Sequence, residues 1–131
     1  MAAAARNIST NRRALVVDDE HHICELIAEM LGEIGFELEC VRSDQEAYRR
    51  LSRAADFELL LVDVNLGAGT TGFDVARFAR QMAPDLPILY VSGQTGRDSF
   101  KAFGVPGAGF IAKPFTMDEL HQAVREALGE A

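Results

Sequence analysis

The stretch FELLLVDVNL, residues 57–66, joins a strongly apolar run directly to a carboxylate. The apolar residues 59–62 have the length and composition of a buried strand, and Asp63 follows them immediately. A carboxylate in that position is costly unless a cation or hydrogen-bond donors compensate its charge. The stretch therefore predicts a core strand that ends at an acid with a function.

The composition is that of a single compact domain. The chain has 131 residues, of which 48% are hydrophobic and 25% are charged. Its net charge of −7 argues against a general binder of nucleic acids or anionic membranes, because phosphate groups require a basic surface. No apolar run approaches the roughly 20 residues that span a bilayer. Residues 1–11 lack the apolar segment of a secretory signal, so we expect a flexible N-terminal tail.

The two cysteines, Cys24 and Cys40, lie in apolar patterns and lack C-x-x-C spacing. This arrangement favours buried, reduced thiols in a cytosolic protein, with a disulfide as the alternative.

Short apolar runs alternate with amphipathic helical patterns along the whole chain. Strands are predicted at residues 14–18, 36–40, 57–63, 88–92 and 109–113. Helices are predicted after them, at about residues 23–34, 43–54, 73–82, 97–103 and 116–128. Capping-box patterns at Ser43 with Glu46 and at Thr116 with Glu119 mark two of the helix starts. Strands that are each followed by a helix indicate an α/β fold with a parallel sheet covered on both faces.

Polar residues stand where several of these strands end. They are Asp18, Asp19, Asp63, Ser92 and Lys113. Ligands of open α/β sheets bind outside the carboxyl ends of the strands, so we expect these side chains to converge. Carboxylates brought together need a cation, and oxygen ligands suit Mg²⁺. A metal, an ammonium and a hydroxyl that face a carboxylate suit a phosphoryl group, and a carboxylate can itself form an aspartyl phosphate.

The motifs resemble those of response-regulator receiver domains of bacterial two-component signalling, of the single-domain type, over about residues 12–129. The matching segments are LVVDDE with Asp18 and Asp19, LLLVDVNL with Asp63, VSG with Ser92, and AKPF with Lys113 and Pro114. The resemblance implies a flavodoxin-like (βα)5 three-layer sandwich with a five-stranded parallel sheet in the order 2-1-3-4-5. It also implies a receiver domain over residues 12–131, after the tail.

The resemblance assigns a role to each matching residue. Asp63 would accept a phosphoryl group from a phosphohistidine. Mg²⁺, or Mn²⁺ in its place, would be held by Asp19, Asp63 and the backbone carbonyl of Asn65, with Asp18 acting mostly through water. Glu20 lies just beside this site.

Lys113 and Ser92 would hold phosphoryl oxygens, and Phe110 would be the aromatic switch residue. Pro114 would follow a cis peptide bond. Asn65 and Gln94 occupy positions that tune the phosphoryl lifetime, and both are uncharged amides, so we expect slow to intermediate self-dephosphorylation. The glycine-rich loop LGAGTTG replaces a Met-Pro pair that is common in the family, which leaves its path over the site open.

The implied partners are a histidine kinase or histidine phosphotransfer protein and a downstream target protein. We expect a cytoplasmic monomer or weak phosphorylation-dependent dimer, without membrane insertion and without direct contact to nucleic acid. Because the last helix ends near the C-terminus, the output is expected through protein contacts unless an output domain was removed. The chain would catalyse only its own phosphorylation and dephosphorylation.

Other interpretations of the same residues stay open at this point. Asp18 could cap a helix, Ser92 could be a turn residue, Lys113 could extend to solvent, and Phe110 could be a core aromatic. As a whole, the chain could be a pseudo-receiver that only docks partners. A haloacid-dehalogenase-like phosphatase is disfavoured, because Asn65 stands where that family has its general acid.

Overall fold

The computed structural model describes residues 12–53, 56–66, 71–93 and 96–130. The predicted tail and residues 67–70 of the glycine-rich loop lie outside these ranges. Strands and helices alternate in the order β1 (Arg12–Val17), α2 (His21–Gly32), β2 (Phe36–Val41), α3 (Asp44–Leu51), β3 (Leu59–Asp63), α4 (Gly72–Met82), β4 (Ile88–Ser92), α5 (Gly96–Phe103), β5 (Gly109–Ala112) and α6 (Met117–Ala127).

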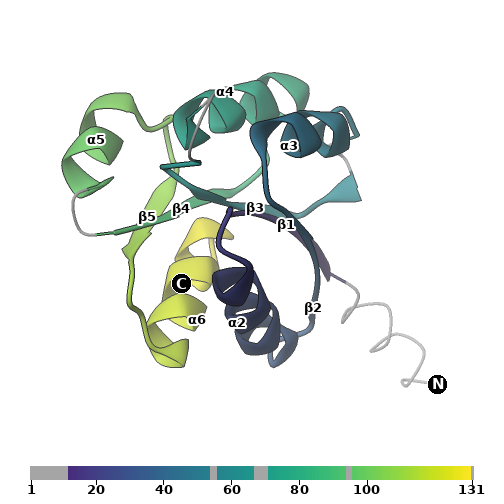
Figure 1. Cartoon of the computed structure of the whole chain (residues 1–131). Coiled ribbons are helices and arrows are strands. Elements are labelled where there is room, and N and C mark those ends of the chain that lie inside the picture. Colours follow the sequence, from purple (N-terminus) through teal and green to yellow (C-terminus); the bar gives the residue numbers. More distant parts are fainter. Residues whose placement is uncertain (1–11, 54–55, 67–70, 94–95, 131) are drawn as a thin grey trace.

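All strand pairs in the sheet are parallel, and the strand order is β2-β1-β3-β4-β5. Helices α2 and α6 cover one face of the sheet, and α3, α4 and α5 cover the other (Figure 1). The predicted three-layer α/β sandwich with the order 2-1-3-4-5 is therefore confirmed. The strand order reverses at β1, so the ends of β1 and β3 lie side by side in the middle of the sheet.

Strand β3 is buried along its entire length because it lies in the centre of the sheet between β1 and β4. Successive side chains of a strand point to opposite faces. Leu60 and Val62 accordingly join the core beneath α3 and α4, whereas Leu59 and Leu61 join the core beneath α2 and α6. The apolar run of the sequence is thus the rigid central element that carries Asp63 to the edge of the sheet.

The helix starts follow the predicted capping patterns, with one difference. Thr116 and Glu119 form both hydrogen bonds of a capping box. Ser43 accepts from the Glu46 N–H over 3.2 Å, but the Glu46 carboxylate accepts from the N–H of Arg42. The capping box predicted there is therefore only half formed. None of the described helices is long and apolar enough to cross a membrane.

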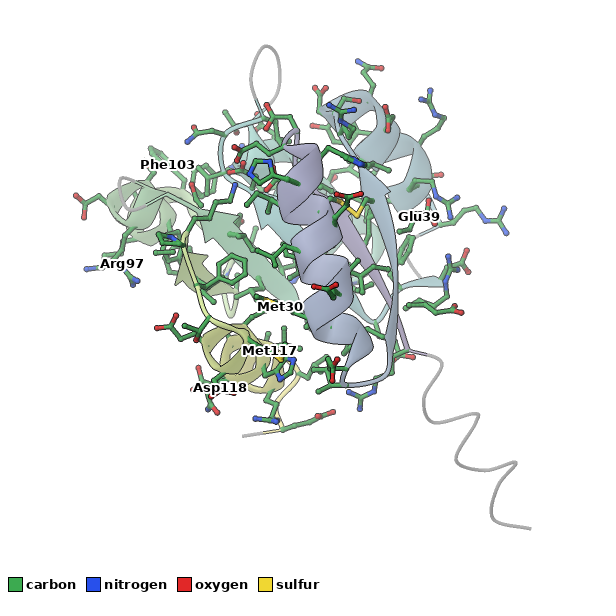
Figure 2. All side chains as sticks on the ribbon, turned by 60° about the horizontal axis from the view of Figure 1, so that its bottom comes forward. Met30, Glu39, Arg97, Phe103, Met117 and Asp118 are labelled. Carbon is green, nitrogen blue, oxygen red and sulfur yellow. A yellow bond between two sulfur atoms is a disulfide. The ribbon has the colours of Figure 1, made fainter. Side chains whose placement is uncertain are left out.

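The prediction of two buried, reduced thiols is wrong, because Cys24 and Cys40 form a disulfide between α2 and β2 (Figure 2). Their Cα atoms lie 6.1 Å apart. Cys24 is buried, as predicted, but Cys40 is exposed on the edge strand. Period-two alternation places Cys40 on the same face of β2 as Leu38, which packs against the α2 side of the core. The packing of helix on strand that brings the two sulfurs together is a tertiary feature, which spacing alone does not reveal.

Candidate functional site

The carboxyl ends of the strands bring the predicted residues to one edge of the sheet. Asp63 is the last residue of β3, Asp18 directly follows β1, and Ser92 is the last residue of β4. Lys113 directly follows β5, and its backbone N–H donates to the carbonyl of Ser92 over 2.7 Å. The peptide bond between Lys113 and Pro114 is cis, the geometry that the family resemblance implies.

The ammonium group of Lys113 is the electrostatic centre of the site. Its Nζ donates hydrogen bonds to Glu20 Oε1 over 3.0 Å and to Asp63 Oδ2 over 3.2 Å. It also lies 3.0 Å from Asp18 Oδ2, as an ion pair without hydrogen-bond geometry. One cation is therefore shared by three carboxylates that come from two different strand ends.

The surroundings oppose the charge of Asp63, which is only 6% exposed. Burial raises the pKa of Asp63, and the neighbouring Asp18 adds to the rise. The N–H of Asn65, 3.1 Å from Asp63 Oδ1, and the Lys113 ammonium act in the opposite direction. The pKa stays above its ordinary value, chiefly because the carboxylate is buried.

Lys113 and the carboxylates that contact it shift each other's pKa in the sense expected of opposite charges. Burial disfavours the Lys113 ammonium, but the contacts with Glu20 and Asp18 and the charge of Asp63 outweigh it and raise the pKa of Lys113. The hydrogen bond and the charge of Lys113 lower the pKa of Glu20. Lys113 thus remains a permanent cation at physiological pH.

The oxygen atoms of this site fit a hard divalent cation. One carboxylate oxygen each of Asp18, Glu20 and Asp63 lies within 4.8 Å of the others, and all three are the hard donors that Mg²⁺ prefers. Of the predicted metal ligands, Asp18 and Asp63 are brought together. Asp19 is exposed, lies outside this group, and has no ion-pair partner in the described part of the chain. Glu20 stands in the group, although the sequence placed it only beside the site.

The hydroxyl of Ser92 is buried next to the charged cluster. It finds no hydrogen-bond partner among the described residues. A Cβ atom added to Gly96 would lie 2.7 Å from Ser92 Oγ, so this hydroxyl packs directly against the start of α5. A buried hydroxyl without a partner is costly, which makes an oxygen atom of a bound group a suitable acceptor for it.

Phe110 and Asn65, two further predicted residues, lie near this centre. Phe110 on β5 is half-buried, its ring centroid lies 5.2 Å from that of Phe100, and the Arg97 guanidinium lies 4.8 Å from its ring centroid. Asn65 is exposed. Gln94, the second residue predicted to tune the phosphoryl lifetime, lies outside the described residues.

Gly72, at the start of α4, also supports the site, and the sequence analysis did not single it out. A Cβ atom at this position would lie 1.9 Å from the carbonyl oxygen of Asp63. The N–H of Gly72 donates to the carbonyl of Val64 over 2.9 Å. Only a glycine lets α4 pack this closely behind Asp63. A glycine at a helix start has many possible reasons, so no sequence signal distinguishes this one.

Comparison with known proteins agrees with this geometry. The chain matches the family described as response regulator receiver domain over residues 14–125. A response regulator receiver protein from Sinorhizobium medicae superposes with a TM-score of 0.84 at 30% identity, covering 91% of this chain and 95% of that chain. The receiver domain of NtrX from Brucella abortus gives a TM-score of 0.80 at 28% identity, covering 90% and 99%.

Curated relatives include the response regulator protein PilR of Pseudomonas aeruginosa, 30% identical over 120 residues, and the transcriptional regulatory protein CrdR of Helicobacter pylori, 26% identical over 115 residues. These alignments cover 91% and 87% of this chain, but only 26% of PilR and 54% of CrdR. The chain thus spans about half or less of the length of these two relatives. By its family match, its fold and its relatives, the chain belongs to the response regulator receiver domains of two-component systems, a family of signalling rather than metabolic proteins.

Proposed function

We propose that the chain is a cytoplasmic phosphoacceptor that takes a phosphoryl group from a histidine kinase or a histidine phosphotransfer protein onto Asp63. The observation that carries this proposal is the contact of 3.2 Å between Lys113 Nζ and Asp63 Oδ2 at the edge of the sheet. A carboxylate nucleophile and a permanent cation in contact are the two groups that phosphoryl transfer to an acid requires.

In the transfer, a carboxylate oxygen of Asp63 attacks the phosphorus atom of the donor phosphohistidine. The new P–O bond forms as the P–N bond breaks, and the imidazole, protonated on its other ring nitrogen, leaves with the bonding electron pair as a neutral ring. The Lys113 ammonium shifts its contact from the Asp63 carboxylate to a phosphoryl oxygen. The Ser92 hydroxyl donates a hydrogen bond to another phosphoryl oxygen. The unpartnered state of Ser92 Oγ among the described residues supports this role.

Mg²⁺, for which Mn²⁺ could substitute, would supply neutralisation of the charge on the phosphoryl oxygens. We assign Asp19, Asp63 and the Asn65 carbonyl as its protein ligands, with Asp18 acting mostly through water. The carboxylate of Glu20 is engaged by Lys113. Because Asp19 is exposed and has no ion-pair partner among the described residues, its carboxylate is available to a metal ion, which supports its assignment as a ligand.

Phosphorylation would then change a protein-binding surface. Ser92 moves toward the phosphoryl group, and Phe110 follows into the space that it leaves. Phe110 is half-buried on β5 and contacts α5 through Phe100 and Arg97, so a change in its position reaches the surface of α5. A downstream target protein, or a weak dimer of this chain, would bind the changed surface.

Two finer expectations differ in their support. The uncharged amides at Asn65 and Gln94 favour slow to intermediate loss of the phosphoryl group, and a lifetime of seconds would contradict this. The expected absence of a nucleic-acid partner gains no support from the relatives, because CrdR is named a transcriptional regulatory protein.

Phosphorylation by a small-molecule donor tests the proposal directly. The purified chain is incubated with acetyl phosphate and Mg²⁺, and the intact mass is recorded with and without chelator. We expect one added phosphoryl group, located on Asp63, that disappears in Asp63→Asn and persists in Asp85→Asn, where the acid is exposed at the far end of the sheet. A wild-type chain that forms no adduct would instead be a pseudo-receiver that only docks its partners.

A further inference from the structure

The Cys24–Cys40 disulfide anchors the helical turn that follows the acidic loop of the candidate site, Asp18 to Glu20. Cys24 lies four residues after Glu20, whose carboxylate contacts Lys113. Cys40 lies next to Val41, whose carbonyl accepts from the N–H of Asp18 over 3.1 Å. The segment from Asp18 to Cys24 is thus tied to the end of β2 twice, by a hydrogen bond at its start and by a covalent bond at its end.

The two sulfurs differ in accessibility. Cys40 is exposed on β2, an edge strand with β1 as its single neighbour in the sheet. Cys24 is 1% exposed and belongs to the same core cluster as Ile27 and Leu31 of α2. An external thiolate therefore reaches Cys40, and Cys24 is the leaving group. Cys24 is the fourth residue of α2, and the N-terminal end of a helix favours a departing thiolate.

In the cytoplasmic location proposed above, the chemistry of the compartment favours a reversible bond. Thioredoxin and glutathione keep most thiols reduced in the bacterial cytoplasm, and disulfides that form there are usually transient or redox-sensing. The chain contains two cysteines in total, so no other pairing within one molecule competes with this bond. The protein therefore has two defined covalent states.

We propose that Cys24 and Cys40 form a reversible redox site that controls how firmly the acidic loop is held, and thereby the phosphorylation of Asp63; the second part of this inference rests on the proposed function. A thiolate of a cellular dithiol attacks Cys40 Sγ, a mixed disulfide forms, and Cys24 leaves as a thiolate that takes up a proton. The second thiol of the dithiol then attacks the dithiol sulfur of the mixed disulfide, and Cys40 leaves as a thiolate that takes up a proton. Two protein thiols and one oxidised dithiol result.

The reduced state keeps the fold but loosens the loop. Strand β2 remains paired with β1 over residues 36–41, and α2 remains packed on the core. The hydrogen bond from Asp18 to Val41 then holds the acidic loop to β2 without covalent support. We expect the affinity for Mg²⁺ and the rate of phosphorylation to fall roughly tenfold, at the lower end of what lost support around a metal site costs.

The test compares the oxidised chain with the same chain after dithiothreitol, the dithiol probe, under native conditions. Intact mass reports the gain of two hydrogens, and amide hydrogen exchange reports the opening of residues 18–24. Acetyl phosphate with Mg²⁺ then gives the phosphorylation rate of each form. Cys40→Ser should match the reduced wild type in amide hydrogen exchange and in phosphorylation rate, and neither quantity should respond to dithiothreitol.

The outcomes separate the redox site from the proposed function. A folded chain whose disulfide resists dithiothreitol, or whose loop exchange and phosphorylation rate are the same in both forms, would overturn the redox site and leave a purely structural disulfide. A chain that is never phosphorylated in either form would overturn the proposed function. In that case, faster exchange of residues 18–24 on reduction would still support the redox site, and unchanged exchange would still overturn it.

Discussion

Lys113 Nζ lies 3.2 Å from Asp63 Oδ2, although β4 separates the strands that carry the two residues. Neighbouring strands in a sheet are about 4.8 Å apart, so the Lys113 side chain reaches across the whole end of β4 to make this contact. The same ammonium also contacts Glu20 and Asp18. A phosphoryl group on Asp63, as proposed, would therefore compete with carboxylates for Lys113.

Replacing Asp63 by asparagine should stabilise the fold at neutral pH. Burial raises the pKa of Asp63, so its ionised form is less favourable in the folded than in the unfolded chain. Lys113 retains Glu20 and Asp18 in the variant. We expect the free energy of unfolding in urea, without Mg²⁺, to rise on the order of 1 kcal/mol.

The difference in stability between Asp63→Asn and the wild type should depend on pH. As the pH falls toward the ordinary Asp value of 3.8, the folded wild type takes up a proton on Asp63 before the unfolded chain does. The wild type gains stability relative to Asp63→Asn in that range, so the difference between them should shrink. Asp85→Asn serves as the exposed control and should change stability by less than about 0.5 kcal/mol. A variant less stable than the wild type at neutral pH would show that the pairing with Lys113 outweighs burial.

Asp19 and Glu20 should differ in their effect on metal affinity. At about ten times its dissociation constant, Mg²⁺ should stabilise the wild type by about 1.4 kcal/mol, and Asp19→Asn should lose most of this gain. Glu20→Gln should keep it, because Glu20 is not among the proposed ligands. The Glu20 side chain is 49% exposed, so loss of its pair with Lys113 should itself cost only about 0–1 kcal/mol of stability. Thermal unfolding over a Mg²⁺ titration measures both variants. A larger loss in Glu20→Gln would assign the ligand to Glu20.

The sequence predicted the fold and the strand ends well because both depend on local patterns. The buried run before Asp63 and the alternation of strands with helices require no knowledge of tertiary contacts. Parallel strands then bring Asp18, Ser92 and Lys113 to the edge where Asp63 lies, once the strand order is known.

The features that were missed depend on distances between elements. The contact of Glu20 with Lys113 spans 93 positions of the sequence, and the close approach of Gly72 to Asp63 depends on how α4 packs on β3. The disulfide depends on the packing of α2 against β2, and the composition favoured the opposite prediction because reducing compartments rarely hold such bonds.

Reduction of the disulfide should lower the stability of the chain without unfolding it. Cys24 and Cys40 are 16 positions apart, and closing a loop of that length stabilises a fold by about 3 kcal/mol in the chain-entropy model. Urea denaturation with and without dithiothreitol measures the difference, and Cys40→Ser should equal the reduced wild type. Equal stability of the oxidised and reduced chains would mean that the disulfide does not constrain the unfolded state.

Gly72→Ala should damage both the fold and the site. The added methyl group would lie 1.9 Å from the Asp63 carbonyl oxygen, so α4 or the end of β3 must move. Overpacking of this kind costs about 1–3 kcal/mol, and a displaced Asp63 should react more slowly with acetyl phosphate. Gly32→Ala is the matched control: the added methyl group meets no atom within 4 Å, and the change should stabilise the chain by about 0.4–1 kcal/mol. If Gly72→Ala were as stable and as reactive as the wild type, α4 would be free to shift, and Gly72 would have no part in positioning the nucleophile.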